Sequence, residues 1–175
     1  YYAEVRNGID GPVVAKFDAA QVSVSGAQTP TTLNGWTVNG SAVVKRDDYV
    51  RLPGTGGNWL TRPRESAFAS LGDMDVRIKL SKDDWTQNPA DIVGRWSTAG
   101  NQKGWLIQLQ GAVFIFYVSR DGSTTLAQNS ASGLPAFAAG STHWLRVAFA
   151  SATGIATFYW SDDGATWTSL GSGAG

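Results

Sequence analysis

The chain of 175 residues contains no cysteine, one histidine and only two glutamates, Glu4 and Glu65. Without cysteine it can form no disulfide, no thiolate metal site and no thiol nucleophile. Basic and acidic residues balance at 14 each, so no long-range field would draw the chain to nucleic acid or anionic lipid. The longest apolar runs, such as residues 112–118, are far shorter than the roughly 20 residues that span a bilayer. We therefore expect a soluble chain that neither binds nucleic acid nor inserts into a membrane.

Turn-forming and aromatic residues are abundant instead. The chain has 21 glycines, 6 prolines, 8 tryptophans, 5 tyrosines and 7 phenylalanines. Aromatic and β-branched side chains favour strands, whereas glycine and proline favour the turns between them. The composition therefore predicts an all-β chain.

Two segments show the alternation of apolar and polar residues that is typical of strands. Residues 73–80 carry apolar side chains at even positions and charged side chains at odd positions. Residues 143–150 repeat the pattern, with Leu145, Val147 and Phe149 on one side. A period of two predicts that each strand buries one face and exposes the other to water, as in an antiparallel sheet.

Two hairpins are predicted from glycine-containing turns. Gly111 separates residues 104–110 from residues 112–119, which predicts two strands joined by a tight turn. The second strand is apolar on both faces, which is typical of a central strand, and its partner carries Gln108. Aspartate and glycine within residues 161–165 predict another hairpin.

About a dozen short strands at intervals of about 8 to 12 residues predict an antiparallel β-sandwich or jelly roll. Residues 1–32 are predicted to be lead-in strands and a polar linker, and residues 33–175 to be the sandwich. The chain begins with Tyr1 rather than methionine, so we expect a fragment of a longer protein.

The order of several motifs resembles one family. The motifs are Glu-Val-Arg-Asn-Gly at 4–8, Val-Val-Ala at 13–15, Gly-Trp-Thr-Val-Asn-Gly-Ser-Ala at 35–42, Leu-Pro-Gly-Thr-Gly-Gly-Asn-Trp at 52–59, Asp-Met-Asp-Val-Arg-Ile at 73–78, Asp-Asp-Trp at 83–85, Arg-Trp at 95–96 and Tyr-Trp-Ser-Asp-Asp-Gly-Ala-Thr-Trp at 159–167. In this order they resemble the concanavalin A-like, laminin G-like jelly-roll domains of minor tail proteins from actinobacteriophages.

The resemblance implies a non-enzymatic module on a virion tail that binds a host cell-surface glycan, contacts other tail proteins and forms a homo-oligomer. It carries over no binding residue, because such domains share a scaffold more reliably than a site. Two alternatives stay open: a purely structural virion decoration, and an accessory carbohydrate-binding domain of a secreted bacterial protein.

A surplus of tryptophan suggests where a glycan would bind, since a flat aromatic ring can stack on the apolar face of a sugar. Trp85 follows two aspartates in a polar loop and is expected to be exposed, and Trp96 is a second candidate. Arg62 and Arg64 could pair with an acidic glycan through bidentate hydrogen bonds. For these arginines a solvated loop is the simpler interpretation.

Aspartates in the same loop region allow a cation site. Asp83, Asp84 and Asp91 could contribute oxygen ligands to Ca²⁺, as could Asp47 and Asp48. No fixed ligand spacing is present, however, and paired aspartates in loops usually cap turns. The spacing therefore favours turn capping over calcium.

Enzymatic interpretations find little support. Glycoside hydrolases need paired carboxylates about 5 to 9.5 Å apart, and no Glu-x-Asp-x-x-Glu run is present. No Gly-x-Ser-x-Gly elbow occurs, although the composition still allows a Ser-His-Asp arrangement. His143 begins a predicted strand on the side of Leu145, so we expect it to be a packing residue at a strand end.

Residues 160–167 partly match the Asp box, a hairpin motif written Ser-x-Asp-x-Gly-x-Thr-Trp. In this alignment Trp160 takes the serine position. An Asp box aspartate caps the turn and the tryptophan packs beneath it, so the motif predicts a stabilised turn rather than a catalytic site.

Overall fold

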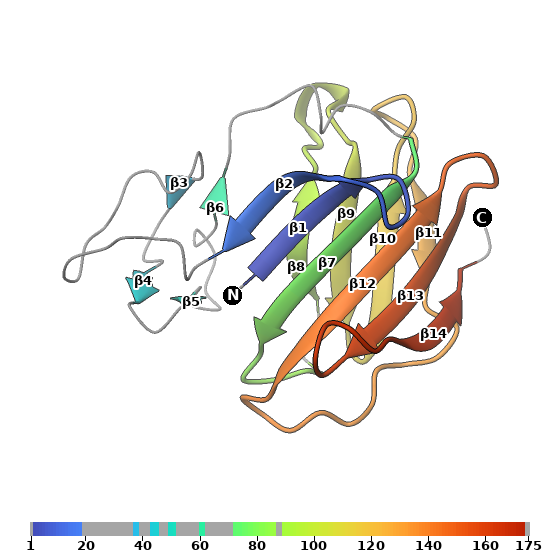
Figure 1. Ribbon diagram of the computed structural model, residues 1–175. Helices are drawn as coiled ribbons and strands as arrows, with labels where there is room; N and C mark the ends of the chain where they lie inside the picture. Colours follow the sequence, from blue (N-terminus) through green and yellow to red (C-terminus); the bar gives the residue numbers. More distant parts are fainter. Residues whose placement is uncertain are drawn as a thin grey trace.

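The computed structural model describes residues 2–18, 37–38, 43–45, 49–51, 60–61, 72–86 and 89–173. Two antiparallel sheets dominate, one of six strands in the order β14-β13-β12-β7-β1-β2 and one of four strands in the order β11-β10-β9-β8 (Figure 1). The larger sheet contains β1 (Tyr2–Asn7), β2 (Val13–Asp18), β7 (Met74–Ser81), β12 (Thr142–Ala150), β13 (Ile155–Ser161) and β14 (Thr168–Ser172). The smaller sheet contains β8 (Ala90–Arg95), β9 (Trp105–Gln110), β10 (Val113–Val118) and β11 (Leu126–Asn129).

Four short strands form two further antiparallel pairs. They are β3 (Thr37–Val38) with β6 (Leu60–Thr61), and β4 (Val43–Lys45) with β5 (Tyr49–Arg51). A single-turn 3₁₀ helix lies at Ala99–Asn101. The prediction of an all-β, antiparallel chain is confirmed, while the jelly-roll identity stays a prediction. Within the described ranges, no helix is long and apolar enough to span a bilayer.

The two large sheets face each other across one apolar core. Phe114 of β10 meets Phe158 of β13 edge to face, with ring centroids 5.3 Å apart. Phe116 of β10 meets Phe149 of β12 at 5.4 Å. All four rings are at most 1% exposed, which makes these contacts the centre of a β-sandwich.

The predicted hairpin around Gly111 is also confirmed. Strands β9 and β10 pair from Gln110 and Val113 through to Trp105 and Val118. Gly111 has a φ of +60°, a conformation that costs glycine little. Side chains therefore alternate along β10 between the core and the outer face of the smaller sheet.

The charged face of β7 is only partly exposed to water: Lys79 is exposed as predicted, but Asp75 is fully buried. Arg77 and Arg146 both donate to its carboxylate, with the shortest contacts at 2.9 Å and 2.8 Å. The Asp10 backbone N–H donates a further hydrogen bond at 3.1 Å, and the Asp10 side chain bridges both arginines. The predicted period of two is present, but the turn between β1 and β2 covers Asp75.

The lead-in strands belong to the larger sheet rather than preceding it. Strand β1 lies between β2 and β7, and Val5 is the register partner of Val76. Residues 2–18 of the range 1–32 are therefore part of the sandwich itself (Figure 1).

The hairpin between β13 and β14 is closed by side-chain hydrogen bonds, which confirms the predicted turn-stabilising role. Asp163 Oδ1 accepts from the backbone N–H groups of Ala165 at 2.8 Å and Thr166 at 2.7 Å. These hydrogen bonds hold the pKa of Asp163 well below its ordinary value.

Two positions of the Asp box alignment were wrong, because the turn is capped by Asp163 rather than Asp162. Ser161, not Trp160, takes the serine role, because Ser161 Oγ donates to Asp163 at 2.8 Å and accepts from the Gly164 N–H at 2.9 Å. The motif is thus one residue shorter than the usual spacing. Trp167 lies over the guanidinium of Arg146, 5.6 Å from ring centroid to Cζ.

Candidate functional site

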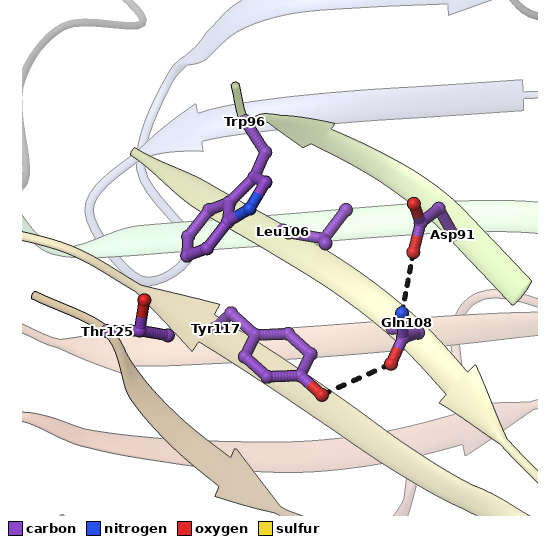
Figure 2. A pocket seen from close by; sticks show the side chains of 6 residues that line it. All are labelled: Asp91, Trp96, Leu106, Gln108, Tyr117 and Thr125. Carbon is purple, nitrogen blue, oxygen red and sulfur yellow. Dashed lines mark hydrogen bonds between the residues drawn. The ribbon is translucent and has the colours of Figure 1, made fainter. Parts of the chain in front are cut away.

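The outer face of the smaller sheet carries an open hollow of about 290 Å³, called the outer hollow below. This volume is at the lower end of the range of small-molecule sites. Its lining comes from all four strands or their flanking residues: Asp91, Trp96, Leu106, Gln108, Tyr117 and Thr125. Figure 2 shows Leu106 between Trp96 and Asp91, with Tyr117 and Gln108 along the opposite border.

Strand register places these side chains together. Gln108 on β9 is the register partner of Asp91 on β8, and Leu106 is the partner of Tyr117 on β10. Ile107 and Leu109 alternate with Leu106 and Gln108 and are fully buried in the core. The pleat therefore turns the hollow's residues away from the core.

A chain of hydrogen bonds crosses three strands along one side of the hollow. The Tyr117 hydroxyl donates to Gln108 Oε1 at 3.2 Å, and Gln108 Nε2 donates to Asp91 Oδ1 at 2.7 Å (Figure 2). Each side chain is held by its neighbour, so the polar groups are positioned before any ligand arrives. Such pre-positioning lowers the entropic cost of binding.

The other side of the hollow is aromatic. Trp96 is half-buried, and its ring lies 6.0 Å from the ring of Tyr117 in a tilted arrangement. The Lys103 ammonium lies 5.8 Å from the Trp96 ring centroid and donates to Ser123 O at 2.7 Å and Thr125 Oγ1 at 3.3 Å. This lysine therefore joins the tryptophan to the loop before β11.

That loop is ordered by Asp121. Its carboxylate accepts from the Ser123 N–H at 2.8 Å and from the Thr124 N–H and hydroxyl, both at 2.7 Å. These bonds, with the Thr124 hydroxyl first among them, hold the pKa of Asp121 well below its ordinary value. The carboxylate stays charged near neutral pH and keeps Thr125 at the rim of the hollow.

Gly122 lets the same loop approach its neighbour closely. It has a φ of +83°, and a Cβ there would lie 2.1 Å from the Asn101 carbonyl oxygen. Its own carbonyl accepts from the Lys103 N–H at 3.2 Å. The rim of the hollow thus depends on a position that only glycine fits.

Two of the predicted site residues meet in the hollow. Trp96 lies there as a ligand-binding candidate, and Asp91 lies there although it was predicted as a metal ligand. Arg62 and Arg64 fall outside the described residues, as do Asp47 and Asp48.

The predicted exposure of Trp85 is wrong. Its side chain is only 4% exposed and packs edge-on against Phe137 at 5.0 Å and His143 at 5.6 Å. The polar residues before it form the surface turn, while the indole ring turns into the end of the core. A buried ring has no free face on which a sugar could stack.

The described carboxylates are not gathered for calcium. Asp84 Oδ1 accepts from the Thr86 N–H and hydroxyl, both at 2.7 Å, so it caps its own turn. Asp83 is exposed beside it, whereas Asp91 is bonded to Gln108 in the hollow. In the part of the chain that the structure describes, no three residues of the metal-ligating types form a cluster.

A Ser-His-Asp arrangement does occur, at the end of β12. His143 Nε2 lies 2.9 Å from Ser141 Oγ, and His143 Nδ1 lies 2.8 Å from Asp162 Oδ1. The ring also stacks on Phe137 with centroids 3.7 Å apart, which confirms the predicted packing role of His143.

The protons of this group argue against an activated serine. Ser141 Oγ donates to the Ala138 carbonyl at 2.6 Å, and a hydroxyl has only one proton to donate. The Ser141 hydroxyl proton therefore points at the Ala138 carbonyl and not at the His143 ring. The group ties the loop before β12 to the hairpin after β13, and nucleophilic catalysis would need the serine proton to point at the histidine instead.

Four lining residues were not predicted from the sequence: Leu106, Gln108, Tyr117 and Thr125. A signal was present in Gln108, which interrupts an apolar strand on the same face as Tyr117 of its hairpin partner. The pairing of β8 with β9, which adds Asp91, had no such local signal.

The fold and the hollow define an all-β protein with two large antiparallel sheets and a polar and aromatic depression on the outer face of the smaller of the two. Comparison with family models, curated proteins and solved structures finds no match to this chain.

Proposed function

We propose that the protein is a non-enzymatic adhesion module of a phage tail and that the outer hollow binds a host cell-surface glycan. The observation that carries the proposal is that aromatic rings and fixed polar groups line the same hollow. The rings are those of Trp96 and Tyr117. The polar groups are the hydrogen-bonded side chains of Asp91 and Gln108 and the Tyr117 hydroxyl.

Sugar rings need this combination of groups. The apolar face of a sugar stacks on an aromatic ring, and its hydroxyls bond to fixed carboxylate and amide groups. Trp96 and Leu106 supply apolar surface, while Asp91 and Gln108 supply polar atoms in the same lining. The hollow is open, so it suits an accessible chain of sugars better than an enclosed small molecule.

The tail location and the host glycan come from the resemblance to tail-protein jelly rolls. A shallow site binds weakly, and repeated copies on one particle would multiply its strength. Homo-oligomerisation and contacts with other tail proteins are part of the same proposal.

Binding of the purified chain to whole actinobacterial cells and to their purified cell-wall polysaccharide tests the proposal. We expect saturable binding that the Trp96→Ala variant weakens by about tenfold or more, because tryptophan is commonly a dominant contact. Ile155→Ala is the matched control, since Ile155 is an exposed apolar residue on the other sheet.

Equal binding by the wild type and Trp96→Ala would contradict the proposed site. No binding by a folded sample, together with capture by other tail proteins, would favour the structural-decoration alternative. Binding to polysaccharides from non-host sources alone would favour the secreted accessory domain. Repeating the titration with a calcium chelator tests the cation site expected from the sequence at Asp83, Asp84 and Asp91. We expect glycan binding to be unchanged, because these carboxylates form no cluster among the described residues.

A further inference from the structure

The hydrogen bonds along the outer hollow can run in only one direction. The Asp91 carboxylate can only accept, so Gln108 must direct its amide nitrogen toward it, as the distance of 2.7 Å indicates. Gln108 Oε1 then faces Tyr117 and can only accept, so the Tyr117 hydroxyl must donate. A flipped amide would place its oxygen against the carboxylate, and the charge on Asp91 prevents this.

This direction decides what the hollow can offer a ligand. Asp91 retains most of its lone pairs, and Tyr117 has given away its only proton and offers oxygen lone pairs. Gln108 keeps one free amide N–H. Among the described residues that line the hollow, Asp91 is also the only charged one. The row therefore presents mainly acceptors and one negative charge.

Lys103 keeps its positive charge, but it lies at the side of Trp96 and Thr125, whereas Asp91 lies at the side of Gln108 (Figure 2). Lys103 lies beside the hollow and is not part of its lining. Two of its three N–H groups donate to the Ser123 carbonyl and the Thr125 hydroxyl, so one N–H group remains for a ligand. Arg120 also follows β10, but it donates to the Ser151 carbonyl on the larger sheet.

We propose that the outer hollow selects neutral, hydroxyl-rich sugar rings over acidic ones, and that Asp91 is the specificity-determining residue, positioned by Gln108. This inference rests on the proposed glycan-binding function. A hydroxyl-rich ring supplies the donors that the row lacks. A uronate or sulfate group would instead bring negative charge toward Asp91, where no arginine of the described residues lines the hollow.

This selectivity is the opposite of the one expected from Arg62 and Arg64, which the sequence suggested as partners of an acidic glycan. Those arginines would favour acidic glycans, whereas the hollow disfavours them. The two hypotheses therefore predict opposite rankings of the same ligands.

Titration with matched oligosaccharides tests the selectivity. The probes are neutral hexamers of glucose, galactose and mannose, each beside its counterpart with the C6 hydroxyls oxidised to carboxylates. For any series that binds, we expect the oxidised form to bind about tenfold more weakly at low salt. Added salt should narrow the difference, because it screens the repulsion.

Asp91→Asn keeps an acceptor for Gln108 and removes only the charge, so the difference between neutral and oxidised forms should fall below about threefold. The matched control is Asp83→Asn, which changes the net charge equally at an exposed turn outside the hollow. It should leave the difference at about tenfold.

The outcomes distinguish the inference from the function on which it rests. If no neutral or oxidised hexamer and no cell-wall polysaccharide binds, the proposed function fails and the inference fails with it. If neutral hexamers bind through Trp96 but their oxidised forms bind equally or better, the function stands and the selectivity is overturned. An equal effect of Asp83→Asn and Asp91→Asn would also overturn the role given to Asp91.

Discussion

Arg146 and Asp75 meet side by side on neighbouring strands of the larger sheet. The guanidinium reaches both carboxylate oxygens, through Nε at 3.0 Å and Nη2 at 2.8 Å. Asp75 is 0% exposed and Arg146 is 8% exposed, so the pair is withdrawn from water. Charges in such a position stabilise a fold only while each keeps its partner.

Asp75→Asn should lower the free energy of unfolding by about 3 kcal/mol, because it leaves Arg77 and Arg146 buried without their shared carboxylate. Urea denaturation at pH 7 measures the change. Asp83→Asn, at an exposed turn, should change stability by less than about 0.5 kcal/mol. A loss for Asp75→Asn as small as that of the control would contradict the structural role of the pair.

Stability should also fall in acid through Asp75. Burial alone would raise its pKa, but the hydrogen bonds from Arg77, Arg146 and the Asp10 N–H outweigh burial and lower it from 3.8. A lowered folded pKa means that the contribution is complete above pH 3.8 and is lost as the pH falls through the folded value. Unfolding free energies measured from pH 6 down to pH 2 should therefore decline less steeply for Asp75→Asn than for the wild type. Parallel curves would show that Asp75 titrates alike in the folded and unfolded chains.

Gly122→Ala and Gly111→Ala form a matched pair at positive φ. Alanine at Gly111, where a Cβ meets nothing within 4 Å, should cost about 1 kcal/mol of stability from backbone strain alone. Alanine at Gly122 should cost more, because its Cβ would clash with the Asn101 carbonyl. It should also weaken glycan binding, since the displaced loop carries Thr125. Thermal unfolding and the polysaccharide titration measure both effects, and equal results for the two variants would refute the close approach at Gly122.

His143→Phe should retain the stack on Phe137 and lose the hydrogen bonds to Asp162 and Ser141. We expect a loss of about 1 to 3 kcal/mol in unfolding free energy, with glycan binding unchanged because the outer hollow lies on the other sheet. Chemical denaturation and titration of the same sample provide both readouts. A binding defect without a stability loss would indicate that His143 serves a ligand rather than the fold.

Local patterns predicted the strands better than they predicted exposure. Alternation placed β7 and β12 correctly, and Gly111 marked the β9–β10 turn, because these signals lie within a few residues. The same alternation implied a wet face at Asp75, which is covered by a turn 65 residues away in the sequence. The exposure of Trp85 was predicted wrongly for a related reason. Its neighbours in the sequence are polar, but its ring packs against Phe137, which follows β8 to β11 in the sequence.

Only part of the candidate site was predicted from the sequence. Trp96 was chosen as an aromatic candidate and Asp91 as a carboxylate, but nothing local indicated that they share a hollow. Gln108 and Asp91 are 17 residues apart and meet only because β8 and β9 pair in one register, shifted by an irregularity between Asp91 and Val93. Such a register depends on the packed core and not on either strand alone.

The ion-pair network of the larger sheet also bears on how the chain folds. Asp10 and Arg146 are hydrogen-bonded although they lie 136 positions apart in the sequence, so synthesis must pass β12 before the network can close. Contacts of such high sequence separation carry a large loop-closure cost and tend to form after the folding barrier. Substitutions in the network would then act mainly on the rate of unfolding and leave the rate of folding almost unchanged. The hairpin of β1 and β2, although it comes before the other strands of this sheet in the sequence, would be among the last parts of the sheet to reach its final position.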